Sequence, residues 1–103
     1  MSVTKGLLVV LEAKPGRADE LAQFLGAGRD LALAEPETVT WYAFRLGETT
    51  FGIFDTFAAE SGREAHLNGE IAQALGRIAP DLLAEAPSIR PVDVLAVKEE
   101  GAS

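Results

Sequence analysis

His66 and Asp55 are the two residues of this chain whose types could carry proton-transfer chemistry. His66 is the single histidine, and histidine is the side chain that titrates near neutral pH without a perturbed pKa. Asp55 shares one face of an apolar segment with Ile53 and Phe57, where a carboxylate must be paired or carry a raised pKa. We expect either residue to be the base that takes a proton from an acidic C–H group or a phenol. Alternatively, both residues have structural roles. His66 would form a hydrogen bond with a backbone carbonyl or with the partner subunit, and Asp55 would cap the following helix or pair with an arginine.

Aromatic side chains are concentrated in the same region. Six of the seven lie between residues 41 and 57, and they could wall a pocket for an aromatic substrate. In that interpretation Arg45 would hold an anionic oxygen and Asn68 a carbonyl. Alternatively, the rings form core or interface, Arg45 makes an inter-subunit ion pair, and Asn68 breaks a helix. The candidate wall residues are Trp41, Tyr42, Phe44, Phe51 and Phe54.

The sequence carries no pattern of a metal or cofactor site. It has no cysteine, and Glu60, Glu64 and Glu70 have no recognised ligand spacing around the histidine. The glycines at 26 and 28 lie inside a helical pattern and lack the Gly-Lys-Ser/Thr of a phosphate loop. Neither a dinucleotide fingerprint nor a nucleophile-elbow serine is present. We therefore expect no metal ion and no bound cofactor.

Six segments predict the secondary structure that must position these residues. Alternating side chains predict strands over residues 5–13, 38–46, 50–57 and 88–98. Helical spacing predicts one helix over 17–35, ended by Pro36. A second helical stretch covers 60–79, is interrupted at Asn68-Gly69, and is closed by Pro80 before a short turn over 81–83. Pro91 requires an edge or entry position in the last strand, and a polar tail follows from residue 98.

The order strand, helix, strand, strand, helix, strand predicts a ferredoxin-like α+β domain with a four-stranded antiparallel sheet. Both helices would cover one face of that sheet. The other face is apolar at Leu8 and Val10 and aromatic in the hairpin. Such a face exceeds the apolar patch that a monomer usually exposes. We therefore expect a homodimer in which two sheets pack face to face.

Chain length and net charge limit which other partners the protein could bind. The 103 residues suit one domain, and their formal net charge is −7. An acidic chain is a poor match for nucleic acid or for an anionic membrane. The apolar run over 6–11 is too short for a secretory signal, and no run is long enough to span a bilayer. We expect a cytoplasmic protein that binds neither nucleic acid nor membrane.

Three segments resemble the antibiotic biosynthesis monooxygenase superfamily, especially its small bacterial members of unassigned activity. They are residues 8–16 with 19–21 and 24–25, residues 41–46, and residues 51–57 with 60 and 65–67. The resemblance implies a dimeric α+β barrel with a pocket between sheet and helices in each subunit. It also implies that Asp55 and Phe57 are the acid and aromatic pair ending the third strand, and that Ala65-His66 is the Ala-His pair of the next helix.

Members of this superfamily differ in activity. Some oxidise aromatic polyketides with O2 and no cofactor, some bind and degrade haem, and others have no known activity. The haem-degrading branch has an asparagine in the first strand and a tryptophan in the pocket. This chain lacks that asparagine and has its only tryptophan in the second strand, so we do not expect haem turnover. Where the family often has Ser and then His-Phe, this chain has Gly69, Ile71 and Ala72.

Two functions follow from these residues. The first is a cofactor-independent monooxygenase acting on a small aromatic or polyketide-like substrate, with His66 or Asp55 as the base. The second is a non-catalytic homodimeric module that binds a small ligand or has a structural role. A pocket shared by His66, Asp55 and aromatic side chains would favour the enzyme, and an apolar pocket too small for a ring system would favour the module.

Overall fold

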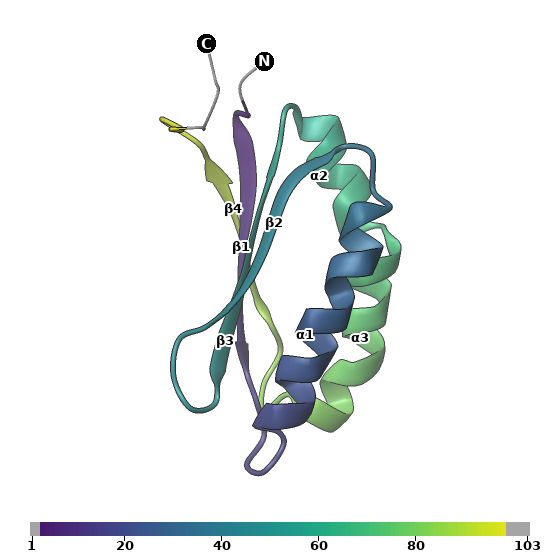
Figure 1. Ribbon diagram of the computed structural model, residues 1–103, viewed down its shortest axis with the longest axis vertical. Coiled ribbons are helices and arrows are strands. Elements are labelled where there is room, and N and C mark those ends of the chain that lie inside the picture. Colours follow the sequence, from purple (N-terminus) through teal and green to yellow (C-terminus); the bar gives the residue numbers. More distant parts are fainter. Residues whose placement is uncertain (1–2, 99–103) are drawn as a thin grey trace.

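The computed structural model describes residues 3–98, in which four strands form one antiparallel sheet and three helices cover one of its faces (Figure 1). The strand order across the sheet is β2-β3-β1-β4. This is the ferredoxin-like α+β fold that the element order predicted. Along the chain the elements are β1 (Lys5–Glu12), α1 (Ala18–Leu33), β2 (Thr38–Arg45), β3 (Thr50–Phe57), α2 (Glu60–Leu67), α3 (Glu70–Leu82) and β4 (Ser88–Asp93).

The strand register decides which side chains face the helices. In the central pair, Val9 lies opposite Ile53 and Leu7 lies opposite Asp55. Because side chains alternate along a strand, the odd-numbered residues of β1 and β3 share the helix-covered face. The predicted division of the strands into two faces is confirmed by this register. The functional consequence is that Asp55 points into the layer between sheet and helices.

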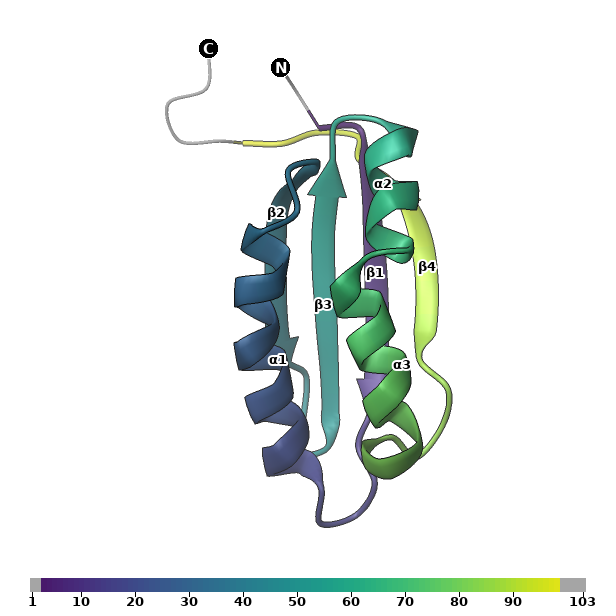
Figure 2. The same ribbon diagram turned by 90° about the vertical axis from the view of Figure 1, so that its right-hand side faces the viewer.

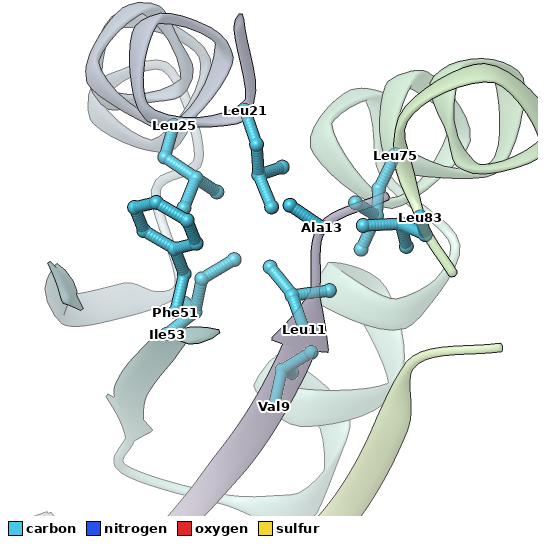
Figure 3. Close-up of a cluster of buried hydrophobic side chains, with 9 residues drawn as sticks. All are labelled: Val9, Leu11, Ala13, Leu21, Leu25, Phe51, Ile53, Leu75 and Leu83. Carbon is cyan, nitrogen blue, oxygen red and sulfur yellow. The ribbon is translucent and has the colours of Figure 1, made fainter. Parts of the chain in front are cut away.

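The core fills the space between the sheet and α1 and α3, as Figure 3 shows. Leu11 of β1 and Leu21 of α1 are fully buried in it. Truncating a fully buried leucine to alanine typically costs about 2–5 kcal/mol of stability, so this cluster makes a large contribution to the fold. Its buried members are Val9, Leu11, Ala13, Leu21, Leu25, Phe51, Ile53, Leu75 and Leu83.

Gly28 allows α1 to lie close to its neighbours. A Cβ atom at this position would lie 3.1 Å from Cδ1 of Ile71 in α3 and 3.5 Å from the indole ring of Trp41 in β2. Gly26, two residues earlier, has open space around it. The glycine at 28 therefore has a packing role, whereas the one at 26 has none within the subunit.

The predicted break at Asn68-Gly69 is confirmed, since it separates α2 from α3. Asn68 closes α2 and donates a side-chain hydrogen bond to the carbonyl of Glu64 at 2.9 Å. Gly69 precedes α3 with extended backbone. The break turns the chain so that α2 and α3 lie over different parts of the sheet (Figure 2).

Two predicted boundaries are wrong. Pro80 does not close α3, which continues to Leu82. Proline costs the helix one N–H donor, and the last turn is held instead by burial of Leu82 and Leu83 and by a hydrogen bond from Leu83 N to the Ala79 carbonyl. β4 ends at Asp93 and not at residue 98, because its partner Lys5 is the first residue of β1. Pro91 does lie in an edge strand, as predicted.

The other face of the sheet carries no helix (Figure 1), and the strand registers place many apolar side chains on it. Tyr42 is 59% exposed there, and the ring of Phe44 lies where a side chain at Gly52 would be. We call this surface the open face, and its large apolar members are Leu8, Val10, Tyr42, Phe44, Phe54 and Val92.

No helix of the described residues has the length and apolarity to cross a membrane. The cytoplasmic location, the single-domain organisation and the absence of a nucleic-acid partner stay predictions, and the polar tail beyond residue 98 lies outside the described residues.

Candidate functional site

His66 lies between two carboxylates. Its Nδ1 is 2.6 Å from Oε1 of Glu35, and its Nε2 is 2.7 Å from Oδ2 of Asp55. The three residues come from different elements: Glu35 from the loop between α1 and β2, Asp55 from β3, and His66 from α2. We refer to them as the Glu35–His66–Asp55 triad.

Asp55 is placed by the central position of β3 in the sheet. It lies opposite Leu7 of β1 on one side and Trp41 of β2 on the other, and its exposure is 0%. The helix α2 lies over it and is fastened to the sheet by Arg63. Nη1 of Arg63 donates to the carbonyls of Gly6, at 3.3 Å, and Val92, at 3.2 Å. The buried carboxylate therefore faces the imidazole of a helix that is itself anchored.

Glu35 is held where α1 ends and the chain turns toward β2. Its Oε1 accepts a hydrogen bond from Oγ1 of Thr38 at 2.8 Å as well as the one from His66. Its Oε2 approaches the α2–α3 break so closely that a Cβ atom at Gly69 would lie 2.7 Å away. Glycine at position 69 therefore leaves room for the Glu35 carboxylate, and the Glu35 side chain is 18% exposed.

The charges of the triad follow from its geometry. An ionised carboxylate only accepts hydrogen bonds, so both ring nitrogens of His66 must carry protons to face two of them, and the ring is then a cation. Burial has the largest single influence on the pKa of His66 and lowers it. The close contacts and the charges of Asp55 and then Glu35 together outweigh burial, so the pKa of His66 is raised above its ordinary value. Neither oxygen of Asp55 has an aligned hydrogen-bond donor among residues 3–98, which leaves the nearby His66 ring to balance its charge.

A pocket of about 310 Å³ adjoins the triad between the loop after α1 and the helix α2. Its volume is at the lower end of the range for small-molecule sites. Glu35 and His66 are both part of its wall, and Asp55 lies behind them. The other lining residues are Leu31, Ala34, Pro36, Glu37, Thr38, Gly62, Ala65, Gly69 and Glu70. We call this space the outer pocket.

A second, smaller cavity of about 40 Å³ lies on the other side of His66, between the sheet and the helices. Its lining is apolar apart from His66 and includes Trp41, Phe24 and Ile53. An apolar cavity that takes up benzene measures about 150 Å³, so this inner cavity is too small for an aromatic ring. His66 is the residue that lines both spaces.

Three of the residues predicted to bind substrate lie on the helix-covered face of the sheet. Trp41 lines the inner cavity, and its buried Nε1 has no acceptor in the described part of the chain. Phe51 belongs to the core (Figure 3). The guanidinium of Arg45 lies 4.8 Å from the centre of the Phe51 ring, which is cation–π distance. None of these three lines the outer pocket.

The remaining predicted substrate residues lie away from His66. Tyr42, Phe44 and Phe54 are on the open face, on the opposite side of the sheet. Asn68 ends α2 and is exposed, with its side chain bonded to that helix. The structure thus brings His66 and Asp55 together and separates them from most of the aromatic side chains.

Glu35 is the site residue that sequence reasoning missed. It is 31 residues from His66 in the sequence, and an acidic residue after a helix has no distinguishing pattern. Its only signal is the following Pro36, which shows that the chain leaves the helix there. Among residues 3–98, no group of three or more His, Asp or Glu side chains is arranged to hold a metal ion. Both ring nitrogens of His66 face carboxylates, so neither offers a lone pair to a metal.

Comparison with known proteins shows which solved structures this chain resembles. No family model matches the sequence, and no curated protein matches it. The solved structure of NE2512, a protein of unknown function from Nitrosomonas europaea, is 48% identical over 97% of both chains, with a TM-score of 0.94. PA3566 from Pseudomonas aeruginosa is 24% identical, over 93% of this chain and 98% of its own, with a TM-score of 0.79.

A third solved structure carries a functional description. It is a candidate antibiotic biosynthesis monooxygenase from Nitrosomonas europaea, 13% identical over 89% of this chain and 90% of its own, with a TM-score of 0.79. At that identity the likeness concerns the fold. The chain therefore belongs to the same family as NE2512 and has the fold of the antibiotic biosynthesis monooxygenases, as the sequence resemblance predicted.

Proposed function

We propose that this protein is a homodimeric, cofactor-independent monooxygenase that oxidises a small aromatic compound bound in the outer pocket. The observation that carries the proposal is the Glu35–His66–Asp55 triad, of which Glu35 and His66 line that pocket. A chain of ionisable groups with carboxylates on both sides of an imidazole can accept, hold and return a proton. Proton transfer is the one chemical step that this reaction requires of the protein.

The reaction needs a substrate with an acidic C–H group beside an aromatic ring or a carbonyl. The triad removes one proton, and the resulting carbanion gives an electron to O2, which forms superoxide and a substrate radical. These two combine into a peroxide anion, which takes the proton back from the triad. Loss of water from the hydroperoxide then leaves a carbonyl, so that a CH2 group and O2 become C=O and H2O.

The outer pocket favours a neutral substrate. Besides the triad, its charged lining residues are Glu37 and Glu70, and the chain as a whole carries −7. Carboxylates in the lining repel an anionic ligand, whereas a neutral phenol or ketone meets no such penalty. The volume of about 310 Å³ suits a compound of one to three rings.

The homodimer rests on the open face. No helix of the subunit covers its apolar side chains, and Tyr42 and Phe54 lie opposite each other on neighbouring strands. Contiguous apolar side chains on a sheet face without a covering helix are typical of a protein–protein interface. A second copy of the sheet would cover Tyr42, Phe44 and Phe54, so we assign these rings to the dimer contact and not to substrate.

A second candidate is a non-catalytic homodimeric module that binds a small ligand. The observation that favours it is the size of the inner cavity, which at about 40 Å³ holds no ring system. In this alternative the triad has a structural role, because it joins α2, β3 and the loop after α1. Binding of a ligand in the outer pocket without oxygen consumption is the result expected of this module.

Oxygen uptake with a panel of anthrone-like and quinol-like compounds tests the proposal. We expect uptake by the wild type, and a loss of about 10²-fold or more in His66→Ala and Asp55→Asn. Glu64→Gln is the matched control, since Glu64 is an exposed acid of the same helix outside the outer pocket, and it should behave as the wild type. Circular dichroism at the assay temperature shows whether each variant is folded. No uptake with any compound of the panel would count against the enzyme, and ligand binding without uptake would support the module.

A further inference from the structure

We propose that Glu35 is the group that takes the proton from the substrate, while His66 stays a fixed cation that orients Glu35 and balances its charge. This inference rests on the proposed function, but it assigns the base to a residue whose position in the sequence gives no hint of the role. It follows from which atoms of the triad have no hydrogen-bond partner and which of its residues line the outer pocket.

His66 has no free ring nitrogen. Nδ1 forms a hydrogen bond with Glu35 at 2.6 Å, and Nε2 makes an ion-pair contact with Asp55 at 2.7 Å, so each nitrogen faces a carboxylate and neither presents a lone pair to the outer pocket. Phe57 packs against the ring with 5.4 Å between ring centres, and the side chain is 9% exposed. The imidazole is therefore held on both edges and cannot rotate to present a lone pair without breaking two charged contacts.

Asp55 is unsuited to meet the substrate. Its exposure is 0%, and it is not among the residues that line the outer pocket. The His66 ring lies between it and Glu35. Asp55 is therefore a positioning residue, which holds the imidazolium in place and pairs with its charge.

Glu35 has the free acceptor. Its Oε1 already receives hydrogen bonds from His66 and Thr38, at 2.6 and 2.8 Å. Its Oε2 is buried beside Gly69 and has no donor among the residues that the structure describes, so this oxygen retains its lone pairs but meets a substrate only if the α2–α3 break gives way. Because Glu35 also lines the outer pocket, it is the one member of the triad that combines pocket position with an unengaged acceptor atom.

The charges favour this transfer. Before it, the triad holds two carboxylates and one imidazolium, a net charge of −1. Afterwards Glu35 is a neutral acid, the His66–Asp55 pair is neutral, and the new substrate anion lies beside the imidazolium, which stabilises it. A carboxylate base that abstracts a proton beside a carbonyl has a precedent in ketosteroid isomerase. Glu35 returns the same proton to the peroxide, so the triad ends in its starting state.

Other charged groups near His66 do not change the roles assigned to Glu35 as base and His66 as cation. Glu37 and Glu70 line the outer pocket without contacting the ring. Arg63, on the same helix, is turned to Glu60 and to the sheet carbonyls. The groups that act on the charge of His66 are Asp55 and Glu35.

The protonation state of His66 can be measured without any substrate. Because His66 is the only histidine, every imidazole ¹⁵N resonance of the protein belongs to this residue. We expect both ring nitrogens to be protonated at neutral pH in the wild type, and the pKa of His66 to fall in Glu35→Gln. A ring with one unprotonated nitrogen at neutral pH would overturn the inference, whether or not the protein turns over any compound.

Kinetics of Glu35 variants test the role of the base. We expect Glu35→Gln to lose about 10²-fold or more in kcat with little change in KM, and Glu35→Asp to recover part of it. With His66 as a required cation, wild-type kcat/KM falls as pH rises through the raised pKa of His66, whereas a histidine base would make it rise. Full activity in Glu35→Gln, or a kcat/KM that rises as the pH passes through the pKa of His66, would overturn the inference. Absence of turnover in the wild type refutes the proposed function instead, and the ¹⁵N measurement then still decides the charge of His66.

Discussion

Replacing His66 with glutamine isolates the contribution of the buried cation to folding. Glutamine keeps the approximate size and one amide donor, but it removes the charge that faces Glu35 at 2.6 Å and Asp55 at 2.7 Å. Asp55 has an exposure of 0%, so the variant keeps a buried carboxylate without a counter-charge. Removing one partner of a buried ion pair typically costs about 3–5 kcal/mol, and we expect a loss in that range at mildly acidic pH.

The loss should shrink as the pH rises. The pKa of His66 is raised in the folded state, above a value of about 6.5 in the unfolded chain. Below about pH 6.5 both states hold the proton, and the stabilisation by the charged ring is fully present. Between the unfolded and the folded pKa the folded state binds more protons, so wild-type stability falls by up to about 1.4 kcal/mol per pH unit. His66→Gln has no such proton and should lack this slope.

Urea unfolding at a fixed protein concentration, followed by circular dichroism from about pH 5.5 to about pH 9, measures the free energy of unfolding against pH for the wild type and for His66→Gln. Asp93→Asn is the matched control, because it removes the exposed ion pair between Lys5 and Asp93. Exposed pairs contribute little, so its curve should run parallel to that of the wild type. If the His66→Gln curve also runs parallel to the wild type, no extra proton is bound by His66 on folding, and the description of His66 as a buried cation is refuted.

Four further substitutions test the packing and the assembly. Gly26→Ala should stabilise the protein by about 0.5–1 kcal/mol in urea unfolding, because alanine favours a helix interior and finds open space there. Gly28→Val should destabilise it, since the side chain would meet Ile71 and Trp41, and equal stability of the two variants would contradict the packing role of Gly28. Leu11→Ala, at a fully buried position, should cost about 2–5 kcal/mol in the same assay. Phe54→Asp on the open face should give a monomer in analytical ultracentrifugation while the wild type is a dimer, and a monomeric wild type would exclude the proposed interface.

Much of the fold could be predicted because it depends on local patterns. The alternation in residues 50–57 places Ile53 and Asp55 on one face, and the strand has the predicted bounds. The Asn68-Gly69 break and the edge position of the strand with Pro91 also follow from backbone chemistry that acts within a few residues. The end of α3 could not be predicted from Pro80, because burial of the following leucines outweighed the cost of the proline.

The candidate site was only half visible in the sequence. His66 stands out as the single histidine and Asp55 as an acid on an apolar strand face, and both observations need nothing beyond residue type and period. Their contact, and the arrival of Glu35 from 31 residues away, depend on how α2 and the loop after α1 pack over β3. No local signal encodes that distance. The sequence by itself determined the faces, the elements and two of the three ionisable groups, whereas the tertiary structure decided that two carboxylates flank one imidazole, since the energy of buried charges depends on distances between segments that only packing brings together.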